Sequence, residues 1–374
     1  MGTICAIGLM SGTSMDGIDV AMLRTDGVAS IEFGPSMFVA YEADFRQRLE
    51  ASLEVAKAIE SREDRPGDLS LLEREITLRH VQAVERFLKT AVGGWGVPEV
   101  VGFHGQTVLH RPHLGVTVQL GDGALLAREL DMPVVYDMRA NDMQHGGQGA
   151  PLVPAYHAAL AASLRGELAG RHPVAFVNVG GISNITYVPS EGDPIAFDTG
   201  PGNTLIDQWV QREGGVPYDA GGTIASEGGV VEAVVARYME APFFRRSGPK
   251  SLDRNDFTLE PMAGLELSDG ARTLAAVSAE AILRSVEHMP EPPKLWIVCG
   301  GGRKNPHIVG DLVSGARTTG AEVIVAEEAG LDGDSTEAEA WAFLAVRSMK
   351  GLPLTFPTTT GCREAVSGGI LAKP

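Results

Sequence analysis

The sequence predicts an α/β protein built from two domains. The chain has 374 residues, and domains usually contain about 100–200 residues, so roughly two are expected. A strand, a glycine-containing turn and a second strand open each half of the chain, and helical patterns follow both times. The predicted domains are residues 1–138 with 350–374, and residues 139–349.

In the first half, an apolar strand at Thr3–Met10 leads into the turn Ser11–Gly17, and a second strand follows at Ile18–Leu23. Apolar residues at helical spacing, or in short buried runs, predict the other elements. These are helices at Asp44–Ser61, Leu69–Val92 and Val153–Leu164, and strands at Glu99–Phe103, Val116–Leu120 and Pro133–Tyr136. The glycine-rich stretch Asp137–Leu152 is predicted to be a loop or hinge.

The second half repeats the opening pattern. Val174–Val179 is apolar, Gly180 and Gly181 interrupt it, and Ile182–Val188 is again typical of a strand. A further strand at Ile195–Phe197 ends at Asp198. The elements expected after it are helices at Thr204–Arg212, Val230–Glu240, Ser268–His288 and Thr336–Met349, and strands at Lys294–Cys299 and Glu322–Val325.

Charge and composition restrict the partners. Lys and Arg total 31 against 48 Asp and Glu, so the net charge is −17. Such a surface repels nucleic acid and anionic lipid, and no apolar run is long enough to span a membrane. We therefore expect small-molecule substrates, with anions held only in local pockets. The three cysteines fit a reduced compartment, and the first residues do not form a signal peptide, so we expect a cytoplasmic protein. A homodimer is a further expectation.

Glycine-rich turns after strands are the candidate nucleotide site. The turn Ser11–Gly17 combines small residues with three hydroxyls, so its N–H groups are free to bind phosphate oxygens. It is not a Walker P-loop, because no Gly-Lys-Ser/Thr follows. A plain hairpin turn is the alternative. The turns at Gly180-Gly181 and Gly300–Gly302 follow strands in the same way, although a mobile loop is the alternative for the latter. Together the three turns predict a nucleotide held by both domains.

Several polar residues are candidates for the chemistry. Asp198, at a strand end, is placed as a general base would be, although capping the next turn is the alternative role. His104, Gln106, Arg139 and Gln148 lie in apolar surroundings, where satisfied structural groups are the alternative. Glu337 opens a predicted helix and is a candidate beside a magnesium ion, while a favourable interaction with the helix dipole is the alternative. The nine histidines show no metal-binding spacing.

Six motifs, in the same order along the chain, resemble those of the anhydro-N-acetylmuramic acid kinase family. They are GLMSGTSMDGID at Gly8–Asp19, GFHGQT at Gly102–Thr107, GGQGAPLVP at Gly146–Pro154, NVGGISN at Asn178–Asn184, FDTGPGN at Phe197–Asn203 and CGGGRKN at Cys299–Asn305. The resemblance implies a two-domain actin-like (ribonuclease H-like) ATPase fold with a central inter-domain cleft. It also implies a reaction of anhydro-sugar, ATP and water that gives N-acetylmuramic acid 6-phosphate and ADP, in the recycling of cell-wall fragments.

The resemblance also implies roles for residues. Asp198 matches the family's catalytic base, and Glu337 is assigned to the magnesium environment. The expected nucleotide-binding residues are Ser11, Gly12, Thr13, Ser14, Met15, Asp16, Gly17, Ile18, Asp19, Gly180, Gly181, Gly300, Gly301, Gly302 and Asn305. The expected sugar-binding residues are His104, Gln106, Arg139, Gln148 and Asn184. Another sugar kinase of the same fold, or a non-catalytic ATP-binding module, is the alternative function.

Overall fold

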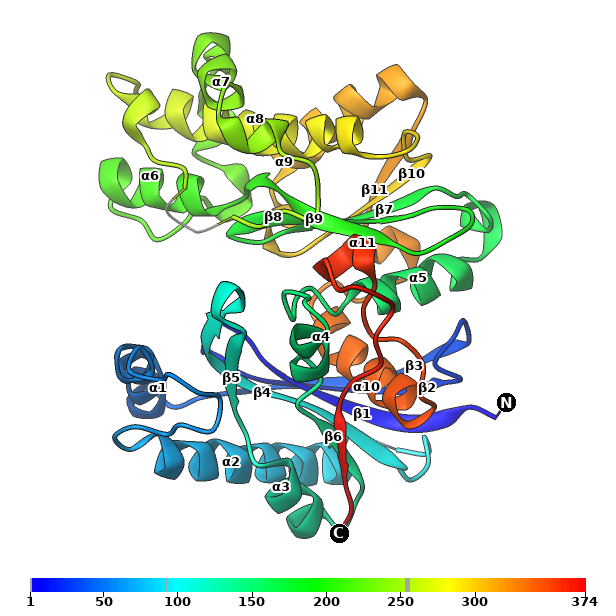
Figure 1. The fold of residues 1–374 in the computed structure, drawn as a ribbon. Coiled ribbons are helices and arrows are strands. Elements are labelled where there is room, and N and C mark those ends of the chain that lie inside the picture. The colour runs from blue at the N-terminus through cyan, green and yellow to red at the C-terminus, as the bar shows by residue number, and fades with distance from the viewer. Residues whose placement is uncertain (1, 92, 253–255) are drawn as a thin grey trace. The chain divides into compact units, whose positions relative to one another are not determined.

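The computed structural model describes residues 2–91, 93–252 and 256–374. Val92, the predicted last residue of the second helix, lies outside these residues. The chain divides into two compact units, Met1–Ser163 with Asp334–Pro374, and Leu164–Gly333. Figure 1 labels their helices and strands.

The described residues of the first unit contain a seven-stranded sheet in the order β12-β6-β4-β1-β2-β3, with β5 paired to β4. Its strands are β1 (Ile4–Ser11), β2 (Gly17–Thr25), β3 (Ile31–Ala40), β4 (Val100–Arg111), β5 (Val116–Leu120), β6 (Val134–Tyr136) and β12 (Ile370–Ala372). Its helices are α1 (Ala43–Ala56), α2 (Leu69–Thr90), α3 (Gly123–Leu130), α4 (Ala140–Gln144), α5 (Pro154–Ser163), α10 (Thr336–Met349) and α11 (Pro357–Thr360).

The described residues of the second unit contain a five-stranded sheet in the order β11-β10-β7-β8-β9. Its strands are β7 (Val174–Val179), β8 (Ile182–Val188), β9 (Ile195–Pro201), β10 (Leu295–Cys299) and β11 (Glu322–Val325). Its helices are α6 (Thr204–Gly214), α7 (Glu232–Met239), α8 (Leu267–Arg284) and α9 (Pro306–Ala316), together with short 3₁₀ turns.

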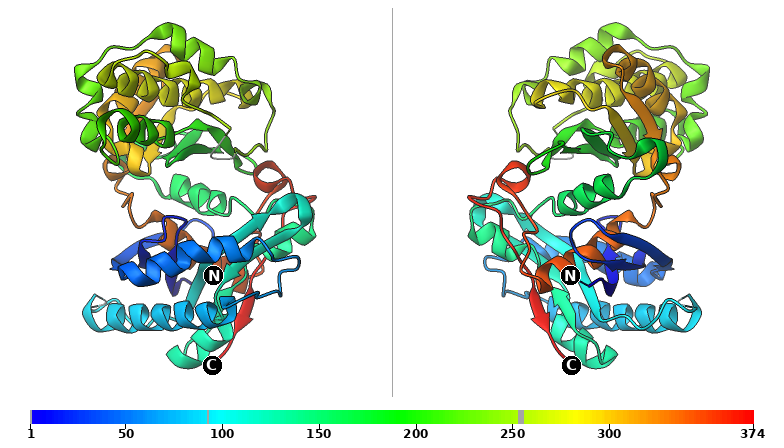
Figure 2. Two further views of the ribbon diagram at one scale, coloured as in Figure 1. Left: turned by 90° about the vertical axis from the view of Figure 1, so that its left-hand side faces the viewer. Right: turned by 90° about the vertical axis from the view of Figure 1, so that its right-hand side faces the viewer.

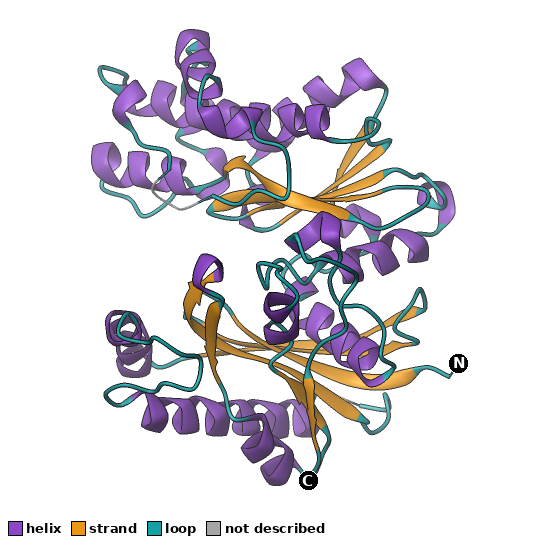
Figure 3. Cartoon of the chain, viewed as in Figure 1, coloured by secondary structure: helices purple, strands orange, loops and turns teal. Residues whose placement is uncertain are grey.

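Five strands of each sheet share one topology. The first strand of each unit is central, and the next two strands follow it in antiparallel succession on one side. Two later strands continue the sheet in parallel on the other side, β4 and β6 in the first unit and β10 and β11 in the second. In the first unit β5 and β12 add antiparallel strands to this arrangement. This is the arrangement that the predicted actin-like fold repeats, so the predicted fold class is confirmed. Figure 3 shows helices beside each sheet.

Alternation along β1 explains how helices cover both faces of the first sheet. Side chains of a strand point to opposite faces in turn. Ile7 and Leu9 therefore join the core formed with α2, which Figure 2 shows lying along the sheet. Gly8 faces α10 instead, and a Cβ there would lie 1.8 Å from the carbonyl oxygen of Ala338. Glycine is thus required for the helix to approach the strand this closely.

The unit boundaries differ from those predicted at residues 138 and 350. The segments 139–163 and 334–349 both belong to the first unit. A buried hydrogen bond ties the first segment to the first unit, since Asp142 accepts from Thr360 at 2.7 Å, and α10 packs on Gly8 of β1. The two segments are also joined to each other, because Tyr156 donates to Glu339 at 2.8 Å. These contacts join residues far apart in sequence, which glycine content near residue 140 does not reveal.

Most predicted helices and strands are confirmed, but some elements were missed. The strand β3 was not predicted because Gly34 and Pro35 interrupt its pattern, and it tolerates them as an edge strand. The strand β4 continues to Arg111 through the polar motif that was taken to follow it. The helices α3 and α9 were also missed. Over the described part of the chain, no helix is long and apolar enough to cross a membrane.

Candidate active site

Asp198 lies in β9 and is held by the segment 250–252 of the same unit. Its backbone N–H donates to the carbonyl oxygen of Lys250 at 2.9 Å, and its Oδ2 accepts from the N–H of Leu252 at 2.8 Å. The first bond fixes the backbone of Asp198, and the second orients its half-buried carboxylate. A group held in this way is suited to proton transfer, which requires a defined geometry.

Burial raises the pKa of Asp198 to about 6, and the N–H of Leu252 and the charge of Lys250 oppose the rise. Burial likewise lowers the pKa of Lys250 to about 8. The Lys250 ammonium lies 4.5 Å from the ring centre of Phe243 and 5.5 Å from that of Phe197. Asp198 thus has the pKa of a base that works near neutral pH. Lys250, which sequence reasoning did not assign to the site, contributes to that value.

Asp198 stands in a row of polar side chains across the sheet. It is the register partner of Asn184 in β8, and Asn184 is the partner of Asn178 in β7. Residues directly opposite one another on antiparallel strands project to the same face. Their neighbours Val177 and Phe197 join the core with α6 and α8, so the polar row lies on the other face. The structure therefore brings the predicted Asn184 and Asp198 together and adds Asn178.

The turn between β1 and β2 is only partly accessible. Thr13, Ser14 and Asp16 are exposed, and Ser14 donates a hydrogen bond to Asp16 at 2.6 Å. Met15 and Ile18 are instead buried in apolar cores. Of the predicted phosphate-binding stretch, residues 12–14, 16 and 19 are therefore the part that a ligand could reach, and the others are buried.

Gln106 fixes this turn. Its Oε1 accepts from the Ser11 hydroxyl at 2.6 Å, and its Nε2 donates to the carbonyl oxygen of Gly12 at 3.0 Å. The Ser11 hydroxyl is fully buried and also lies 2.9 Å from the hydroxyl of Tyr41. Both residues were predicted to contact a ligand, and in this structure their polar atoms bind the protein.

In the second unit, the backbone of Gly180 and Gly181 holds a neighbouring turn in place. The carbonyl oxygen of Gly181 accepts from the N–H groups of Gly202 and Thr204, and that of Gly180 accepts from the N–H of Asn203 at 2.8 Å. The turn between β7 and β8 therefore supports the turn that joins β9 to α6. The two motifs that contain these turns form one local structure.

The third glycine turn borders a cavity of about 500 Å³ within the second unit. Residues from the start of α6, the segment 218–221 and the turn after β10 line it. Gly300 and Gly302 are closely packed, since Cβ atoms there would lie 2.2 Å from Asn178 and Val179 respectively. At Gly301, which lines the cavity, the nearest atom to an added Cβ is Nδ2 of Asn203 at 3.9 Å. Only Gly301 of the three leaves open space for a ligand.

Polar side chains also line this cavity. Asn305 lines it, but its Oδ1 caps α9 by accepting from the N–H of His307 at 3.0 Å. Tyr218 is exposed at its edge. Asp207 also lines it, and burial, followed by the charge of Asp219, raises its pKa to about 6. Sequence reasoning missed Asp207 and Tyr218, which no local motif marks.

The remaining predicted sugar-binding residues belong to the first unit. Arg139 donates from Nη2 to Nε2 of His104 at 3.0 Å and from Nη1 to the carbonyl oxygen of Gly149 at 2.8 Å. Burial lowers the pKa of Arg139 to about 10. The backbone N–H of Gln148 donates to the carbonyl oxygen of Thr360 at 2.9 Å. The structure thus brings His104 and Arg139 into direct contact.

Glu337 lies in the first turn of α10, next to Ala338, which packs on Gly8 of β1. Its side chain is exposed, but surrounding protein raises the pKa of the carboxyl, and the charge of Arg139 opposes that rise. No group of three or more His, Cys, Asp or Glu residues able to hold a metal is present in the described ranges. A magnesium ion here would need ligands from a bound phosphate or water.

Comparison with known proteins gives one family. A family model described as anhydro-N-acetylmuramic acid kinase matches residues 4–373. Proteins of that name from Agrobacterium fabrum (strain C58) and Brucella abortus (strain 2308) are 55% identical over 368 residues and 56% identical over 369 residues. The matches cover 98% and 99% of this chain and 98% of each relative. A glucokinase of the ROK family from Streptomyces griseus, solved with glucose and AMPPNP, is 16% identical with a TM-score of 0.39, over 92% of this chain and 99% of that one. A structural similarity with a TM-score this low supports no conclusion about this chain.

Proposed function

The chain belongs to the anhydro-N-acetylmuramic acid kinase family, and on that basis we propose that it converts 1,6-anhydro-N-acetylmuramic acid, ATP and water into N-acetylmuramic acid 6-phosphate and ADP. The observation that supports this best is Asp198, a half-buried carboxylate with a pKa of about 6 whose Oδ2 accepts a hydrogen bond from the backbone N–H of Leu252. The reaction belongs to the recycling of peptidoglycan fragments. The three free, buried cysteines suit a cytoplasmic location.

Asp198 acts as the base in this proposal. It accepts a proton from the water molecule that attacks C1 of the sugar, and the C1–O6 bond of the anhydro bridge breaks. The freed O6 attacks the γ-phosphorus of ATP, and the bond to the bridging oxygen of ADP breaks. A positioned base contributes about 10²–10⁴-fold to the rate. Asn184 and Asn178, in the same row of side chains, supply hydrogen-bonding groups to orient water or sugar.

The nucleotide is assigned to the glycine turns. The cavity beside Gly301 accommodates the nucleoside, and the carboxylate of Asp207 accepts hydrogen bonds from its hydroxyl or amino groups. The exposed part of the turn between β1 and β2 offers N–H groups and hydroxyls to the phosphates.

Magnesium fits the residues present. Mg²⁺ in nucleotide sites binds one or two carboxylates together with phosphate oxygens and water. Glu337 is an exposed carboxylate with no hydrogen-bond partner among the described residues, and we assign it to hold the ion or one of its water ligands. The ion supplies charge neutralisation to the transferring phosphoryl group.

Mass spectrometry of the product formed in ¹⁸O-labelled water tests the coupled reaction. We expect one ¹⁸O atom at the C1 hydroxyl of a sugar phosphorylated at O6, because water opens the bridge and O6 keeps its own oxygen. Label in inorganic phosphate without a phosphorylated sugar would indicate simple ATP hydrolysis. Phosphorylation of ordinary hexoses without label would indicate another sugar kinase.

Replacing Gly301 with valine tests the nucleoside assignment. We expect at least about tenfold weaker binding of an ATP analogue, or about 1.4 kcal/mol, because the added side chain fills the cavity without meeting protein backbone. Isothermal titration calorimetry measures the affinity, and the thermal midpoint should stay unchanged. Gly229→Val is a matched control, since its Cβ would also find its nearest atom at 3.9 Å and it does not line the cavity. Equal affinities for both variants would contradict the assignment.

A further inference from the structure

Two neighbouring threonines at the end of α11 differ in what their hydroxyl groups hold. Thr359 and Thr360 are both buried, with 1% and 0% of their surfaces exposed. The Thr359 hydroxyl is engaged within its own turn, since it donates to the carbonyl oxygen of Phe356 at 3.0 Å and accepts from the N–H of that residue at 3.1 Å. The Thr360 hydroxyl instead donates at 2.7 Å to Oδ1 of Asp142, which lies 218 positions earlier in the chain. Thr360 therefore links α11 to a distant part of the first unit.

Asp142 is the buried group to which Thr360 is tied. Its side chain is only 1% exposed, and its Oδ2 accepts from the N–H of Gly149 at 2.6 Å. The loop after α4 passes closely around this carboxylate, because a Cβ added at Gly147 would lie 2.2 Å from Oδ2. Hydrogen bonds to a carboxylate are short and strong. Since its two oxygens hold Thr360 and Gly149, the position of the loop depends on that of α11.

Backbone and side-chain bonds hold the same loop at three further points. The carbonyl oxygen of Thr360 accepts from the N–H of Gln148 at 2.9 Å. The N–H of Arg363 donates to the carbonyl oxygen of His145 at 3.0 Å, and its Nη2 donates to that of Gln144 at 3.2 Å. The residues 360–363 therefore brace the loop from residue 144 to residue 149.

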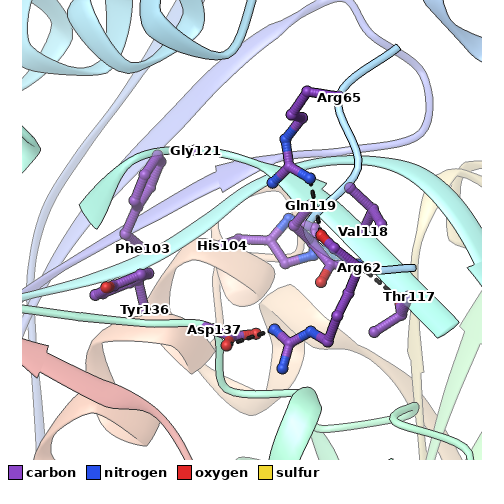
Figure 4. A pocket seen from close by; sticks show the side chains of 10 residues that line it. All are labelled: Arg62, Arg65, Phe103, His104, Thr117, Val118, Gln119, Gly121, Tyr136 and Asp137. Atoms are coloured by element: carbon purple, nitrogen blue, oxygen red, sulfur yellow. Dashed lines mark hydrogen bonds and ion pairs between the residues drawn. The ribbon is translucent and has the colours of Figure 1, made fainter. Parts of the chain in front are cut away.

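Gly149 passes this restraint on to Arg139, because its N–H binds Asp142 and its carbonyl oxygen accepts from Nη1 of Arg139 at 2.8 Å. Three direct hydrogen bonds thus connect Thr360 to Arg139. The other bond of this guanidinium, from Nη2, goes to Nε2 of His104, which Figure 4 shows in the wall of a cavity of about 110 Å³. The Nε of Arg139 is buried and has no hydrogen-bond partner within the described ranges.

We propose that Thr360 and Asp142 are positioning residues for the reaction: they hold Gly149, and through it the guanidinium of Arg139, in the orientation that the substrate requires. This rests on the proposed function and on the expected role of Arg139 in sugar binding. A guanidinium is planar and its N–H groups point in fixed directions, so a small rotation weakens its contacts with a ligand. The segment after α10 therefore acts on the reaction through Arg139, although Thr360 itself is buried against Asp142.

The test compares Thr360→Val with Thr359→Val, since each removes one buried hydroxyl. For Thr360→Val, we expect kcat/KM for 1,6-anhydro-N-acetylmuramic acid to fall about tenfold to a hundredfold, because Asp142 loses a donor and the loop shifts. KM for the sugar should change more than KM for ATP, and the calorimetric Kd of an ATP analogue should stay within about twofold. Thr359→Val should lower the thermal midpoint by a similar amount, yet leave kcat/KM within about threefold of wild type. Thr360→Ser keeps the hydroxyl and should restore kcat/KM to the same range.

A double substitution tests whether Thr360 acts through Arg139. Arg139→Met alone should lower kcat/KM for the sugar. In that background, Thr360→Val should cause less than about a twofold further loss, because residues that act through one another are not additive. Full additivity of the two losses, equal kinetic losses for the two valine variants, or wild-type kinetics for Thr360→Val overturns the proposal. Failure of the wild type to phosphorylate the sugar would instead overturn the proposed function.

Arg363→Met provides the same test if Thr360→Val does not fold. The Arg363 side chain is exposed, so its removal leaves the carbonyl groups of Gln144 and His145 to water rather than burying an unpaired group. We expect a loss of about threefold to tenfold in kcat/KM for the sugar, which should again disappear in the Arg139→Met background. Unchanged kinetics for Arg363→Met would then overturn the proposal.

Discussion

Replacement of Asp198 with asparagine is expected to lower kcat by about 10²–10⁴-fold while leaving ATP binding intact, because the amide cannot accept the proton of the attacking water. The side chain keeps its shape and an oxygen able to accept from the N–H of Leu252, so the local structure should persist. Steady-state kinetics together with calorimetry of an ATP analogue measure both effects. Asp193→Asn is the control, since Asp193 is exposed in the loop before β9. Near-normal turnover of the Asp198 variant would remove this residue from the role of base.

The same residue sets a pH dependence. The carboxyl must be ionised to act, so wild-type kcat/KM should fall as the pH drops through about 6. Stability should change in the opposite direction. The folded pKa lies above the unfolded value of about 3.9, so the carboxyl favours the folded state below that value and this contribution is lost as the pH rises through 6.

Asp198→Asn should therefore stabilise the protein at pH 8, by on the order of 1–3 kcal/mol, and have little effect at pH 4. Chemical denaturation at the two pH values measures this difference. A carboxylate that costs stability in its working state is typical of an active-site group. Equal stability changes at both pH values would show that burial does not act on this carboxyl.

Replacement of Gly8 with alanine is the second large expected effect, a loss of about 3 kcal/mol or more in the free energy of unfolding. The new Cβ would lie 1.8 Å from the carbonyl oxygen of Ala338 and 2.5 Å from the N atom of Ala342, and both are backbone atoms of α10. A side chain could rotate away, but a helix backbone cannot move without separating from β1 and β4. Thermal unfolding should show a midpoint lower by roughly 6–12 °C.

Gly310→Ala is the matched control for this prediction. Gly310 lies inside α9, and an added Cβ would meet no atom within 4 Å. Alanine should raise stability there by about 0.5–1 kcal/mol, because it reduces the freedom of the unfolded chain. If both variants unfold at the wild-type temperature, the close approach of α10 to β1 is wrong.

The sequence was sufficient for features that depend on local patterns. The strand pairs around the turns 11–17 and 180–181 were predicted correctly, because apolar runs interrupted by small residues are a short-range signal. The strand β3 carries no such signal, because Gly34-Pro35 breaks it and pairing with β2 stabilises it. Helix α9 was missed although Asn305 and Pro306 mark its start.

For the candidate site too, the sequence showed local features but not tertiary contacts. Asp198 was singled out because the predicted strand ended there within a recognised motif, although β9 continues to Pro201. Lys250 approaches Asp198, and Asp207 approaches the cavity beside Gly301, only through tertiary packing. Gln106 and Asn305 were predicted to bind ligands, and in this structure the amide groups of both hold other parts of the protein, although Asn305 also lines the cavity beside Gly301. A local pattern shows that a side chain is polar and where it lies in the chain, but not which partner it faces.

The composition of the first unit has a consequence for synthesis on the ribosome. In this unit α10 packs on β1 and β4, and β12 extends the sheet. The first unit therefore cannot complete its fold until residues 336–372 have emerged. The second unit is continuous, and its sheet can close as soon as residue 325 is available. During synthesis the second unit can therefore complete its sheet before the first unit does. Until α10 has been synthesised, the face of the first sheet that this helix covers stays exposed.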